Sequence, residues 1–376
     1  MTTPAPAKAG AAPRPRRRAL FPSFRLGTPH ARLVRAAAFF VLAALLLPLC
    51  GCWLDALRYR PFSVSEYDTF DTVVTLYGYE TDESVFRTRA DAAVARLTEL
   101  HRMMDIYHEY DGMVNLATVN RLAGGEPVEV PRELFDLLAL GYQIHEMTDG
   151  AVNVALGAVT RLWHECRLEA ESDPEAARLP DPDALAEAAR HCDITQMILD
   201  PDACTVTLTD PAMSLDVGAL GKGWAADLLA DTMTALGCAH YAINLGGNLR
   251  MIGKKPDGSD WTVGVQNPEG PDAEYLCRLA LSSLSLSTSG SYQRCYTVDG
   301  VRYHHIIDPA TGYPADHGYT SVSVLTFSAA MADALSTYLF LLSEEDGRAL
   351  IDGMDGVEAY WAREDGTTFQ SQNWPG

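Results

Sequence analysis

A single apolar run near the N-terminus divides this chain into unlike parts. Ala36–Leu49 (AAAFFVLAALLLPL) is 14 consecutive apolar residues, too short to span a bilayer comfortably but typical of a signal-peptide core. The residues before it include eight Lys or Arg and no acid, as in the basic segment of an export signal. The sequence therefore predicts residues 1–51 as a basic leader and signal peptide, residues 52–65 as a tether and residues 66–376 as the folded domain.

The junction after the apolar run, Leu49-Cys50-Gly51-Cys52, resembles a bacterial lipobox, in which a Cys is lipidated and becomes the mature N-terminus. Leu three positions before a Cys, with Gly directly before it, favours lipidation at Cys52 over Cys50, which follows a bulky residue. A signal anchor that is never cleaved is the alternative. In either case we expect the folded domain on the extracytoplasmic face of a cell membrane, periplasmic or at the outer surface, and the lipobox predicts a lipid anchor.

The charge of the chain is strongly asymmetric. The whole sequence has 29 Lys+Arg and 50 Asp+Glu, and removal of the eight N-terminal bases leaves 21 against 50 in residues 52–376, a net charge of −29. A body this acidic repels a nucleic-acid backbone, so no nucleic-acid partner is expected. Binding of phosphate groups would require a local device: a metal ion, a helix N-terminus, or one or two placed cations.

Six cysteines lie in the predicted domain, and none of them forms a CxxC motif, so neither a zinc cluster nor a thioredoxin-like site is favoured. Their even number in an oxidising compartment permits disulfides, but buried free thiols are equally compatible with the sequence. They are Cys166, Cys192, Cys204, Cys238, Cys277 and Cys295.

Helices and runs of consecutive strands share the predicted domain. Apolar residues that recur every three or four positions predict the helices, and β-branched and aromatic segments predict the strands. The helices are predicted at Val85–Tyr107, Pro131–Met147, Gly221–Leu236, Ser328–Leu342 and Glu344–Asp352, with a short one in an acidic surface excursion at 167–190. The strands are predicted at Thr69–Tyr79, Gln196–Leu199, Thr205–Leu208, Tyr241–Leu245, Leu249–Ile252, Trp261–Val265, Tyr275–Leu284, Tyr303–Ile307 and Thr320–Leu325. This mixture predicts an α+β fold, a single two-lobed domain of mixed sheet and helices, and not a regular βαβ array.

A glycine-rich segment, Asp216–Trp224 (DVGALGKGW), ends a short strand and opens a helix at Gly221. Such a helix start suits a phosphate because it presents free N–H groups and the positive end of the helix dipole, and Lys222 adds a full charge. It is not a P-loop, because only two residues separate Gly218 from Gly221 and Gly223 stands where Ser or Thr would bind magnesium. A tight turn that needs glycine for steric reasons is the alternative.

Two further polar segments have simpler interpretations. Residues 244–248 (NLGGN) predict a hairpin turn between two strands, although glycines there could also let a ligand approach the backbone. Thr288–Tyr292 (TSGSY) is hydroxyl-rich, is expected to be flexible, and could donate to phosphate oxygens. A serine nucleophile is not favoured, because no G-x-S-x-G motif is present.

Residues 303–314 (YHHIIDPATGYP) place His304 and His305 next to each other near a strand end. Adjacent strand residues point to opposite faces, so the two histidines cannot share one metal without distortion. We expect one to face a site and the other to be packed or exposed, and zinc is not favoured. Asp308, before Pro309, caps the turn in the simplest interpretation.

Asp333 and Thr337 are spaced i and i+4 on an otherwise apolar predicted helix, with Ser336 at i+3 (ADALSTYLFLL). One helix face thus carries a carboxylate and a hydroxyl, which are hard oxygen donors. A carboxylate on a core-facing surface is costly unless it is paired or binds a cation. Magnesium accepts such ligands and keeps water or phosphate in its other positions. Local hydrogen bonding of Asp333 and Thr337 is the alternative.

Five of these segments together resemble the ApbE family, the FAD:protein FMN transferases, over roughly Thr69–Trp361. They are DVGALGKGWAAD (216–227), NLGGN (244–248), STSGSY (287–292), HHIIDPATGYP (304–314) and ADALST (332–337). The resemblance implies an ApbE-like, T-fold-related fold in an exported lipoprotein or signal-anchored enzyme. It also implies magnesium-dependent cleavage of FAD, in which FMN passes through its phosphate to a Thr or Ser hydroxyl of an acceptor protein and AMP leaves.

The resemblance assigns roles to individual positions. The magnesium ligands implied are the side chains of Asp333 and Thr337 and main-chain oxygens of Ala219 and Ser336. His305 matches a histidine beside the site, and either His305 or Asp216 would be the base that takes the proton of the acceptor hydroxyl. The positions implied to contact FAD are Phe70, Tyr107, Ala151, Val152, Asn153, Asp216, Lys222 and Ile306.

Two positions depart from the family pattern: Phe70 stands where Met is common, and Asn153 where Asp is frequent. No D-x-x-[ST]-G-A-T stretch occurs in the chain, so we expect the acceptor to be a separate flavoprotein subunit of an exported or membrane electron-transfer complex. Two other functions remain compatible with the sequence. One is a lipoprotein that holds FAD without reacting, and the other is an FAD pyrophosphatase that releases free FMN and AMP.

Overall fold

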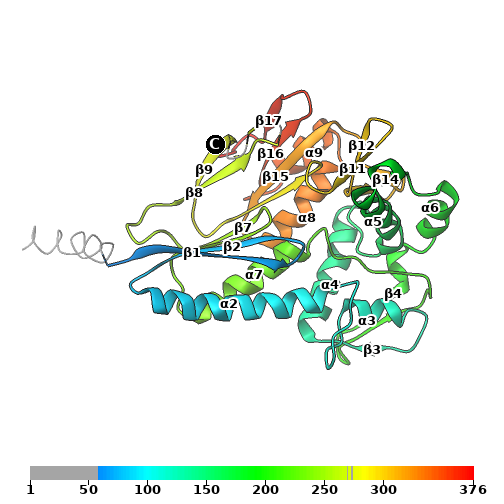
Figure 1. The fold of residues 1–376 in the computed structure, drawn as a ribbon, viewed down its shortest axis with the longest axis horizontal. Coiled ribbons are helices and arrows are strands. Elements are labelled where there is room, and N and C mark those ends of the chain that lie inside the picture. Colours follow the sequence, from blue (N-terminus) through cyan, green and yellow to red (C-terminus); the bar gives the residue numbers. More distant parts are fainter. Residues whose placement is uncertain (1–57, 269, 272–273) are drawn as a thin grey trace, which may run out of the picture. The chain divides into compact units, whose positions relative to one another are not determined.

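An antiparallel sheet of eight strands forms the centre of the fold. The computed structural model describes residues 58–268, 270–271 and 274–376. Within them the strand order is β1-β2-β6-β7-β10-β15-β16-β17, and every neighbouring pair is antiparallel. Figure 1 shows the β1–β2 hairpin at one edge of this sheet. The strands are β1 (Arg60–Thr69), β2 (Thr72–Glu80), β6 (Tyr241–Leu245), β7 (Asn248–Ile252), β10 (Ser285–Gly290), β15 (Tyr319–Thr326), β16 (Glu358–Arg363) and β17 (Thr368–Gln370).

Three helices cover one face of the sheet. The helix α2 (Glu83–Met104) runs along the β1–β2 hairpin, with α7 (Gly221–Ala235) beside it, and α8 (Ala329–Phe340) packs against β10 and β15 (Figure 1). The side chains of β2 alternate, so that Val74 and Leu76 face these helices in the main hydrophobic core. A second cluster lies between α8, α9 (Glu344–Asp352), β15 and β16.

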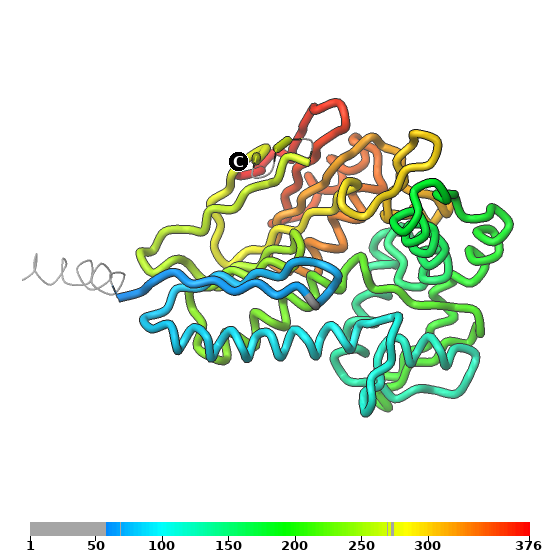
Figure 2. Tube along the Cα trace, viewed as in Figure 1, coloured from blue at the N-terminus to red at the C-terminus, as the bar shows by residue number. Residues whose placement is uncertain are grey.

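The opposite face of the sheet carries a hairpin with a core of its own. It consists of β8 (Trp261–Gln266) and β9 (Tyr275–Leu281), paired in an antiparallel manner. Trp261 packs on Tyr79 of β2, with 5.7 Å between the ring centroids. Figure 2 shows this hairpin on the side of β1 and β2 away from α2.

Between β2 and β6 the chain also forms a helical part, which lies near the C-terminal end of α2 (Figure 2). This part includes a small three-stranded sheet of order β3-β5-β4. The hairpins β11–β12 and β13–β14 pack against it through an aromatic cluster that includes Trp163 and Tyr296. The remaining elements are α3 (Leu116–Arg121), β3 (Val128–Glu129), α4 (Arg132–Met147), α5 (Gly157–Ser172), η1 (Pro174–Ala176), α6 (Pro182–Ala189), η2 (Ile194–Gln196), β4 (Met197–Asp200), β5 (Thr205–Leu208), β11 (Cys295–Val298), β12 (Val301–His304), β13 (Ile307–Asp308), β14 (Tyr313–Pro314) and α9 (Glu344–Asp352).

The predicted mixture of helices and consecutive strands is confirmed, and α9 has the predicted bounds. The surface excursion predicted at 167–190 is in part wrong, because its first residues belong to α5, whose buried face includes Cys166 and Ala170. The tether predicted at 52–65 is too long, because β1 begins at Arg60 and pairs with β2 along its whole length.

The segment from β9 to β10 also differs from the prediction. The strand expected at Tyr275–Leu284 is interrupted near Ser283, whose φ of 53° reverses the chain. The segment expected to be a flexible loop from Thr288 is mostly β10, a central strand between β7 and β15. Two of its hydroxyls find partners on neighbouring elements: Thr288 contacts Ser323 of β15 at 2.7 Å, and Ser289 contacts Ser336 of α8 at 2.8 Å.

The six cysteines in the described part of the chain are all free thiols. No helix among residues 58–268, 270–271 and 274–376 is long and apolar enough to cross a membrane. The predicted signal peptide and the lipidation site at Cys52 lie outside the described residues.

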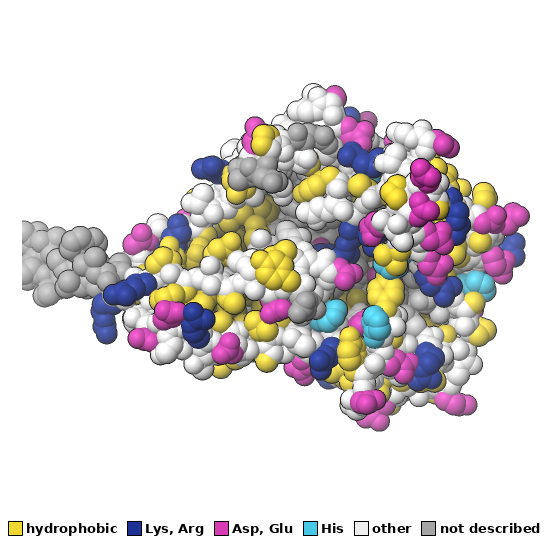
Figure 3. Space-filling model, viewed as in Figure 1, with side chains coloured by type: hydrophobic (Ala, Val, Ile, Leu, Met, Phe, Trp, Pro, Cys, Tyr) yellow, Lys and Arg dark blue, Asp and Glu magenta, His cyan; other side chains and the backbone are white. Residues whose placement is uncertain are grey.

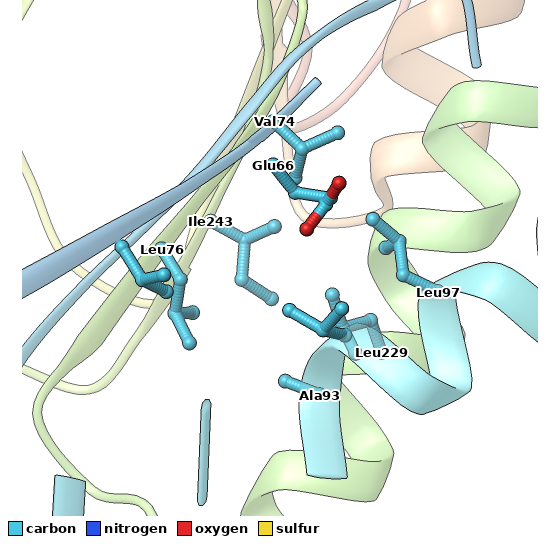
Figure 4. Close-up of a pocket in the computed structure, with 9 residues that line it drawn as sticks. Glu66, Val74, Leu76, Ala93, Leu97, Leu229 and Ile243 are labelled. Carbon is cyan, nitrogen blue, oxygen red and sulfur yellow. The ribbon is translucent and has the colours of Figure 1, made fainter. Parts of the chain in front are cut away.

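A small cavity lies under the β1–β2 hairpin. Val64, Leu76, Leu97, Leu229 and other apolar side chains line it, and its volume is about 20 Å³ (Figure 4). This space holds at most a single water. It is a packing gap between the sheet and α2 and α7, and not a substrate site.

The helices α7 and α8 approach each other closely at Gly223. A Cβ atom there would lie 2.1 Å from the carbonyl oxygen of Ala329 and 2.8 Å from Cα of Ala330. Both contacts are with backbone, which cannot swing away. Glycine is therefore needed here for a steric reason, but at a contact between two helices and not in the tight turn considered from the sequence.

We predict that Gly223→Ala lowers the free energy of unfolding by about 1–3 kcal/mol, because the added methyl group forces the two helices apart. Chemical denaturation of the variant measures the loss. Gly353→Ala is the control for glycine substitution as such, since Gly353 has a φ of −90° and a Cβ atom added there would lie 3.4 Å from its nearest neighbour, the Leu350 carbonyl oxygen. Equal losses in both variants would contradict the packing argument.

Candidate active site

A pocket of about 650 Å³ opens where the central sheet meets the helical part. Its volume lies within the range usual for small-molecule sites. In the space-filling view, histidine side chains gather beside a hollow near the tip of the β1–β2 hairpin (Figure 3). Of the positions to which the sequence assigns roles in binding or catalysis, all line this pocket except Ser336: Phe70, Tyr107, Ala151, Val152, Asn153, Asp216, Ala219, Lys222, His305, Ile306, Asp333 and Thr337.

Asp333 lies at the floor of the pocket, between the N-terminus of α7 and the face of α8. Its carboxyl group is almost fully buried, with 4% of the residue exposed. Its Oδ2 accepts a hydrogen bond from the Gly223 N–H at 2.9 Å, and its Oδ1 lies 3.7 Å from Lys222 Nζ. Burial raises the pKa of Asp333, and the charge of Lys222 and the Gly223 N–H act in the opposite direction.

This contact corrects one expectation about the start of α7. A phosphate was expected to bind free N–H groups there, but the Gly223 N–H is already occupied by a carboxylate from α8. Lys222 remains at the pocket wall, so a cation is still available to an anionic ligand.

Thr337 shares the pocket-facing side of α8 with Asp333, as predicted from their i, i+4 spacing. Ser336 is turned away, because a step of three residues rotates a side chain farther around the helix axis than a step of four. It is fully buried, and its hydroxyl contacts Ser289 Oγ at 2.8 Å and the Asp333 carbonyl at 2.9 Å. Ser289 also contacts Thr337 Oγ1 at 3.2 Å, so the Ser336 side chain reaches the site only through its neighbours. Its main-chain oxygen as a metal ligand stays a prediction.

The chemistry of this corner fits a hard divalent cation. Asp333 and Thr337 offer a carboxylate and a hydroxyl oxygen, and the backbone of Ala219 lines the same pocket. Magnesium prefers such ligands and retains water or phosphate in its other positions. Asn248, which is 1% exposed and contacts Asp333, has a buried side-chain oxygen without a hydrogen-bond partner in the part of the chain that the structure describes. In that same part, no three His, Cys, Asp or Glu side chains cluster as metal ligands.

Asp216 lies on the pocket wall before α7. Its Oδ1 accepts the Gly218 N–H at 2.8 Å and its Oδ2 accepts the hydroxyl of Thr160, on α5, at 2.9 Å. Both oxygens are thus engaged, which fixes the orientation of the carboxylate. The site holds Asp216 as a positioned acceptor with lone pairs remaining toward the pocket.

Tyr107 stands at the pocket rim on the loop that follows α2. Its ring stacks on His164, with 5.0 Å between the centroids. The surrounding protein raises the pKa of Tyr107 to about 12, and Asp216 and Asp71 act in the same direction. The phenol is therefore protonated near neutral pH and can donate a hydrogen bond.

Asp105 shapes the loop that carries Tyr107. Its carboxylate accepts the N–H groups of Tyr107 and His108 at 2.7 and 3.2 Å and the hydroxyl of Tyr110 at 2.8 Å. These hydrogen bonds outweigh the effect of burial and lower the pKa of Asp105. The carboxylate closes the end of α2 and turns the chain toward the pocket.

The two adjacent histidines have different environments, as predicted. His304 packs edge-on against Phe340, and both its ring nitrogens are occupied, by the Ala315 carbonyl at 3.1 Å and the Ile306 N–H at 3.2 Å. His305 lines the pocket, where it is accessible to solvent. The surrounding protein, and then the charges of Arg294 and Lys222, lower the pKa of His305, so its imidazole is neutral near pH 7.

The tip of the β1–β2 hairpin forms another part of the wall. Phe70 and Asp71 make a two-residue turn with φ values of 57° and 49°. Such turns favour Asn-Gly because both residues are left-handed, and a bulky residue there is strained. The Phe70 N–H donates to His101 Nδ1 at 3.2 Å, and Arg294 Nη2 donates to the carbonyls of Phe70 and Asp71, each at 3.2 Å.

The segment Ala151–Asn153 lines the pocket opposite α8. The side chain of Asn153 is occupied within the protein, because its amide donates to the Cys192 carbonyl at 2.8 Å and accepts the Ala155 N–H at 2.9 Å. Its side chain therefore stabilises the loop, and the segment offers its backbone to the pocket.

Several pocket residues were not found from the sequence: His101, Asp105, Thr160, His164 and Arg294. Asp105 could have been recognised as a carboxylate at a helix end. Arg294 gave no local signal, because its contacts with Phe70 and Asp71 cross more than 220 residues of chain.

Comparison with known proteins agrees with the fold and the pocket. The model of the ApbE family matches residues 70–361. The chain is 38% identical over 257 residues to an FAD:protein FMN transferase of Treponema pallidum, covering 65% of this chain and 69% of that protein. It is 34% identical over 241 residues to one of Klebsiella pneumoniae, covering 64% and 72%.

Solved structures give the same result. The ApbE protein of Thermotoga maritima superposes with a TM-score of 0.73 at 27% identity, and the flavin transferase ApbE of Vibrio cholerae with 0.70 at 25%, each covering 84% of this chain and 98% of the other. The protein is an enzyme of the transferase class. The chain belongs to the ApbE family.

We predict that Asp71→Gly raises the free energy of unfolding by up to about 1 kcal/mol. A residue with a side chain pays about 1–2 kcal/mol for a left-handed conformation, and glycine does not. Part of this stabilisation is lost, because glycine has more backbone entropy in the unfolded state. Thermal unfolding measures the change. Asp202→Gly is the matched control, since Asp202 is exposed and does not have a positive φ; a stabilising effect there would contradict the explanation.

Proposed function

We propose that this chain is an FAD:protein FMN transferase, which uses magnesium to transfer FMN from FAD to a Thr or Ser hydroxyl of an acceptor protein and releases AMP. The observation that carries the proposal is the grouping of Asp333, Thr337, Lys222 and His305 around one pocket. The names of the relatives support the same activity.

Phosphoryl transfer requires positioning and charge neutralisation more than covalent catalysis. The pyrophosphate of FAD carries two negative charges into a body of strongly negative net charge. Lys222 and Arg294 line the pocket as cations. A magnesium ion bound by Asp333, Thr337 and the Ala219 backbone would neutralise the phosphate oxygens, and Asp333 must be ionised to bind it.

The proposed reaction breaks the phosphoanhydride bond of FAD and forms a phosphoester bond to the acceptor. The acceptor hydroxyl oxygen attacks the phosphorus of the FMN half, and the bond from that phosphorus to the bridging oxygen breaks. AMP leaves with the bonding electrons. The proton of the hydroxyl goes to a base, for which His305 and Asp216, which both line the pocket, are the two candidates.

The predicted partners and location belong to the same proposal. The acceptor would be a separate flavoprotein subunit of an exported or membrane electron-transfer complex. A lipid anchor at Cys52 would hold the enzyme at the extracytoplasmic face of the membrane, close to such an acceptor.

Two other functions share the same pocket, and one experiment separates all three. The purified chain is incubated with FAD, Mg²⁺ and an acceptor protein, and flavin fluorescence is recorded on a denaturing gel alongside chromatography of the nucleotides. A transferase gives protein-linked flavin and AMP. Free FMN and AMP without labelled protein would show a pyrophosphatase, and intact FAD would show a binding protein; either result would refute the proposed activity.

Asp333→Asn tests the metal site directly. We expect transfer to fall by at least about a hundredfold, since removal of the charge removes the principal ligand for the cation. We also expect the variant to lose the Mg²⁺-dependent rise in melting temperature that binding to the native state gives the wild type.

Asp231→Asn is the matched control, because Asp231 lies on the exposed side of α7. It should keep both the activity and the response to Mg²⁺. If Asp333→Asn is fully active and still stabilised by Mg²⁺, Asp333 is not a metal ligand.

A further inference from the structure

The tip of the β1–β2 hairpin is held in a strained conformation at the pocket wall. Phe70 and Asp71 both have positive φ values, and neither is glycine. A left-handed conformation costs about 1–2 kcal/mol for each such residue. Strain of this kind persists only where surrounding contacts enforce it. The contacts that enforce it here come from two other parts of the chain.

Arg294 supplies one of these contacts. It lies between β10 and β11, and its guanidinium Nη2 donates to the carbonyls of both strained residues at 3.2 Å. His101 of α2 supplies the other, since its Nδ1 accepts the Phe70 N–H at 3.2 Å and its ring meets the Phe70 ring edge-on. The donor and acceptor groups of the turn are thus satisfied from outside the hairpin.

The same arginine contacts the segment that carries His305. Cys295 pairs with His304 in the β11–β12 hairpin, which places Arg294 opposite His305 one residue further on. The main chain of Arg294 is close enough to the His305 ring to raise the pKa of that histidine, against the effects of burial and of the Arg294 charge. Arg294 thus joins the aromatic wall of the pocket to its histidine.

The charge of Arg294 is not neutralised by a carboxylate. Among the residues that the structure describes, no Asp or Glu lies within ion-pair distance of its guanidinium, in contrast to Arg167 at the same pocket, which pairs with Glu171. Burial is the main cause that lowers the pKa of His305, and the charge of Arg294 acts in the same direction. For His164 burial and then Arg167 lower the pKa, with a smaller contribution from Arg294. Lys222 from α7 and the neighbouring His304 act on His305 in the same direction.

We propose that Arg294 is a positioning residue of the FAD site: its guanidinium fixes the strained Phe70–Asp71 turn, and its place opposite His305 in the chain register sets the separation between that turn and the histidine across the pocket. This role rests on the proposed function, since it concerns the geometry in which FAD and the acceptor hydroxyl meet. Arg294 itself need not touch the reacting atoms.

Two substitutions separate the hydrogen bonds from the charge. Arg294→Gln removes both the fork of donors and the cation, whereas Arg294→Lys keeps a cation but not the fork. We expect both variants to raise the KM for FAD about tenfold with a smaller change in kcat, because the Phe70–Asp71 turn is no longer held at the pocket wall by Arg294. Hydrogen exchange in residues 60–80 should become faster in both.

The pH dependence gives a readout that a purely structural role would not change. Loss of the Arg294 charge removes repulsion from the protonated His305 ring, so its pKa rises. If His305 acts in its neutral form, the acid limb of kcat moves to higher pH in Arg294→Gln by about half a unit or more. In Arg294→Lys the limb should stay at its wild-type position.

Arg278→Gln is the matched control, because Arg278 lies on β9, outside the pocket lining, where it stacks on Tyr275. It should leave KM, hydrogen exchange at 60–80 and the pH profile unchanged. The proposal is overturned if Arg294→Gln and Arg294→Lys bind FAD and exchange like the wild type. It is also overturned if the two variants have a lower melting temperature and a lower kcat but the KM and the pH profile of the wild type. Should Arg294→Gln fail to fold, the KM and exchange results for Arg294→Lys decide.

Failure of the proposed function would be visible separately. The affinity for FAD is measured by equilibrium titration of flavin fluorescence, without an acceptor protein. If the wild type binds FAD but transfers no FMN, the transferase assignment fails. Weaker binding and faster exchange in both Arg294 variants would then still support the positioning of the turn, and unchanged binding and exchange would refute it.

Discussion

The buried carboxylate of Asp333 is the constraint on which the rest of the site depends. It bridges two helices that come from distant parts of the chain, accepting an N–H from the first turn of α7 while its own helix, α8, packs against the same turn. Such a group is costly to bury unless positive charge compensates it. Lys222 supplies part of that compensation, and Gly223 allows the close approach that makes the contact possible. The position of α7 and that of the acidic floor of the pocket are therefore determined together.

An acidic protein that binds a doubly charged dinucleotide must concentrate its positive charge. Here the cationic side chains of the pocket are few and come from separate elements: Lys222 from α7, Arg294 from the loop after β10 and Arg167 from α5. Among the described residues, Arg167 forms a close ion pair with Glu171. The contact between Lys222 and Asp333 is longer, at 3.7 Å. A cation at Asp333 would free Lys222 to act on the phosphates, which links metal binding to nucleotide binding electrostatically.

The sequence predicted those parts of the site whose signal is local. The i, i+4 spacing placed Asp333 and Thr337 on one helix face, and the glycines of 244–248 were correctly assigned to a hairpin turn. His304 and His305 do have different environments, but the reason differs from the predicted strand alternation, because β12 ends at His304 and His305 lies in a bend. Contacts between distant segments could not be predicted in this way. The hydrogen bond from Arg294 to the Phe70 carbonyl forms only because the folded chain brings these two distant residues together. The segment from Thr288 was expected to be flexible because it is rich in hydroxyls, and the partners that hold them in a strand, Ser323 and Ser336, come from distant parts of the chain.

The order of strands in the sheet has a consequence for how the chain acquires its structure. The hairpin β1–β2 is the first part to be synthesised, but its inner neighbour is β6, more than 160 residues further along the chain. Until β6 and α7 are present, Val74 and Leu76 have no complete surface to cover them. Contacts this distant in sequence slow folding and leave apolar surface open in the meantime. A chain that crosses a membrane from its N-terminus would thus hold an incomplete sheet through most of its passage, and the pocket would form only after α8, close to the C-terminus, had arrived.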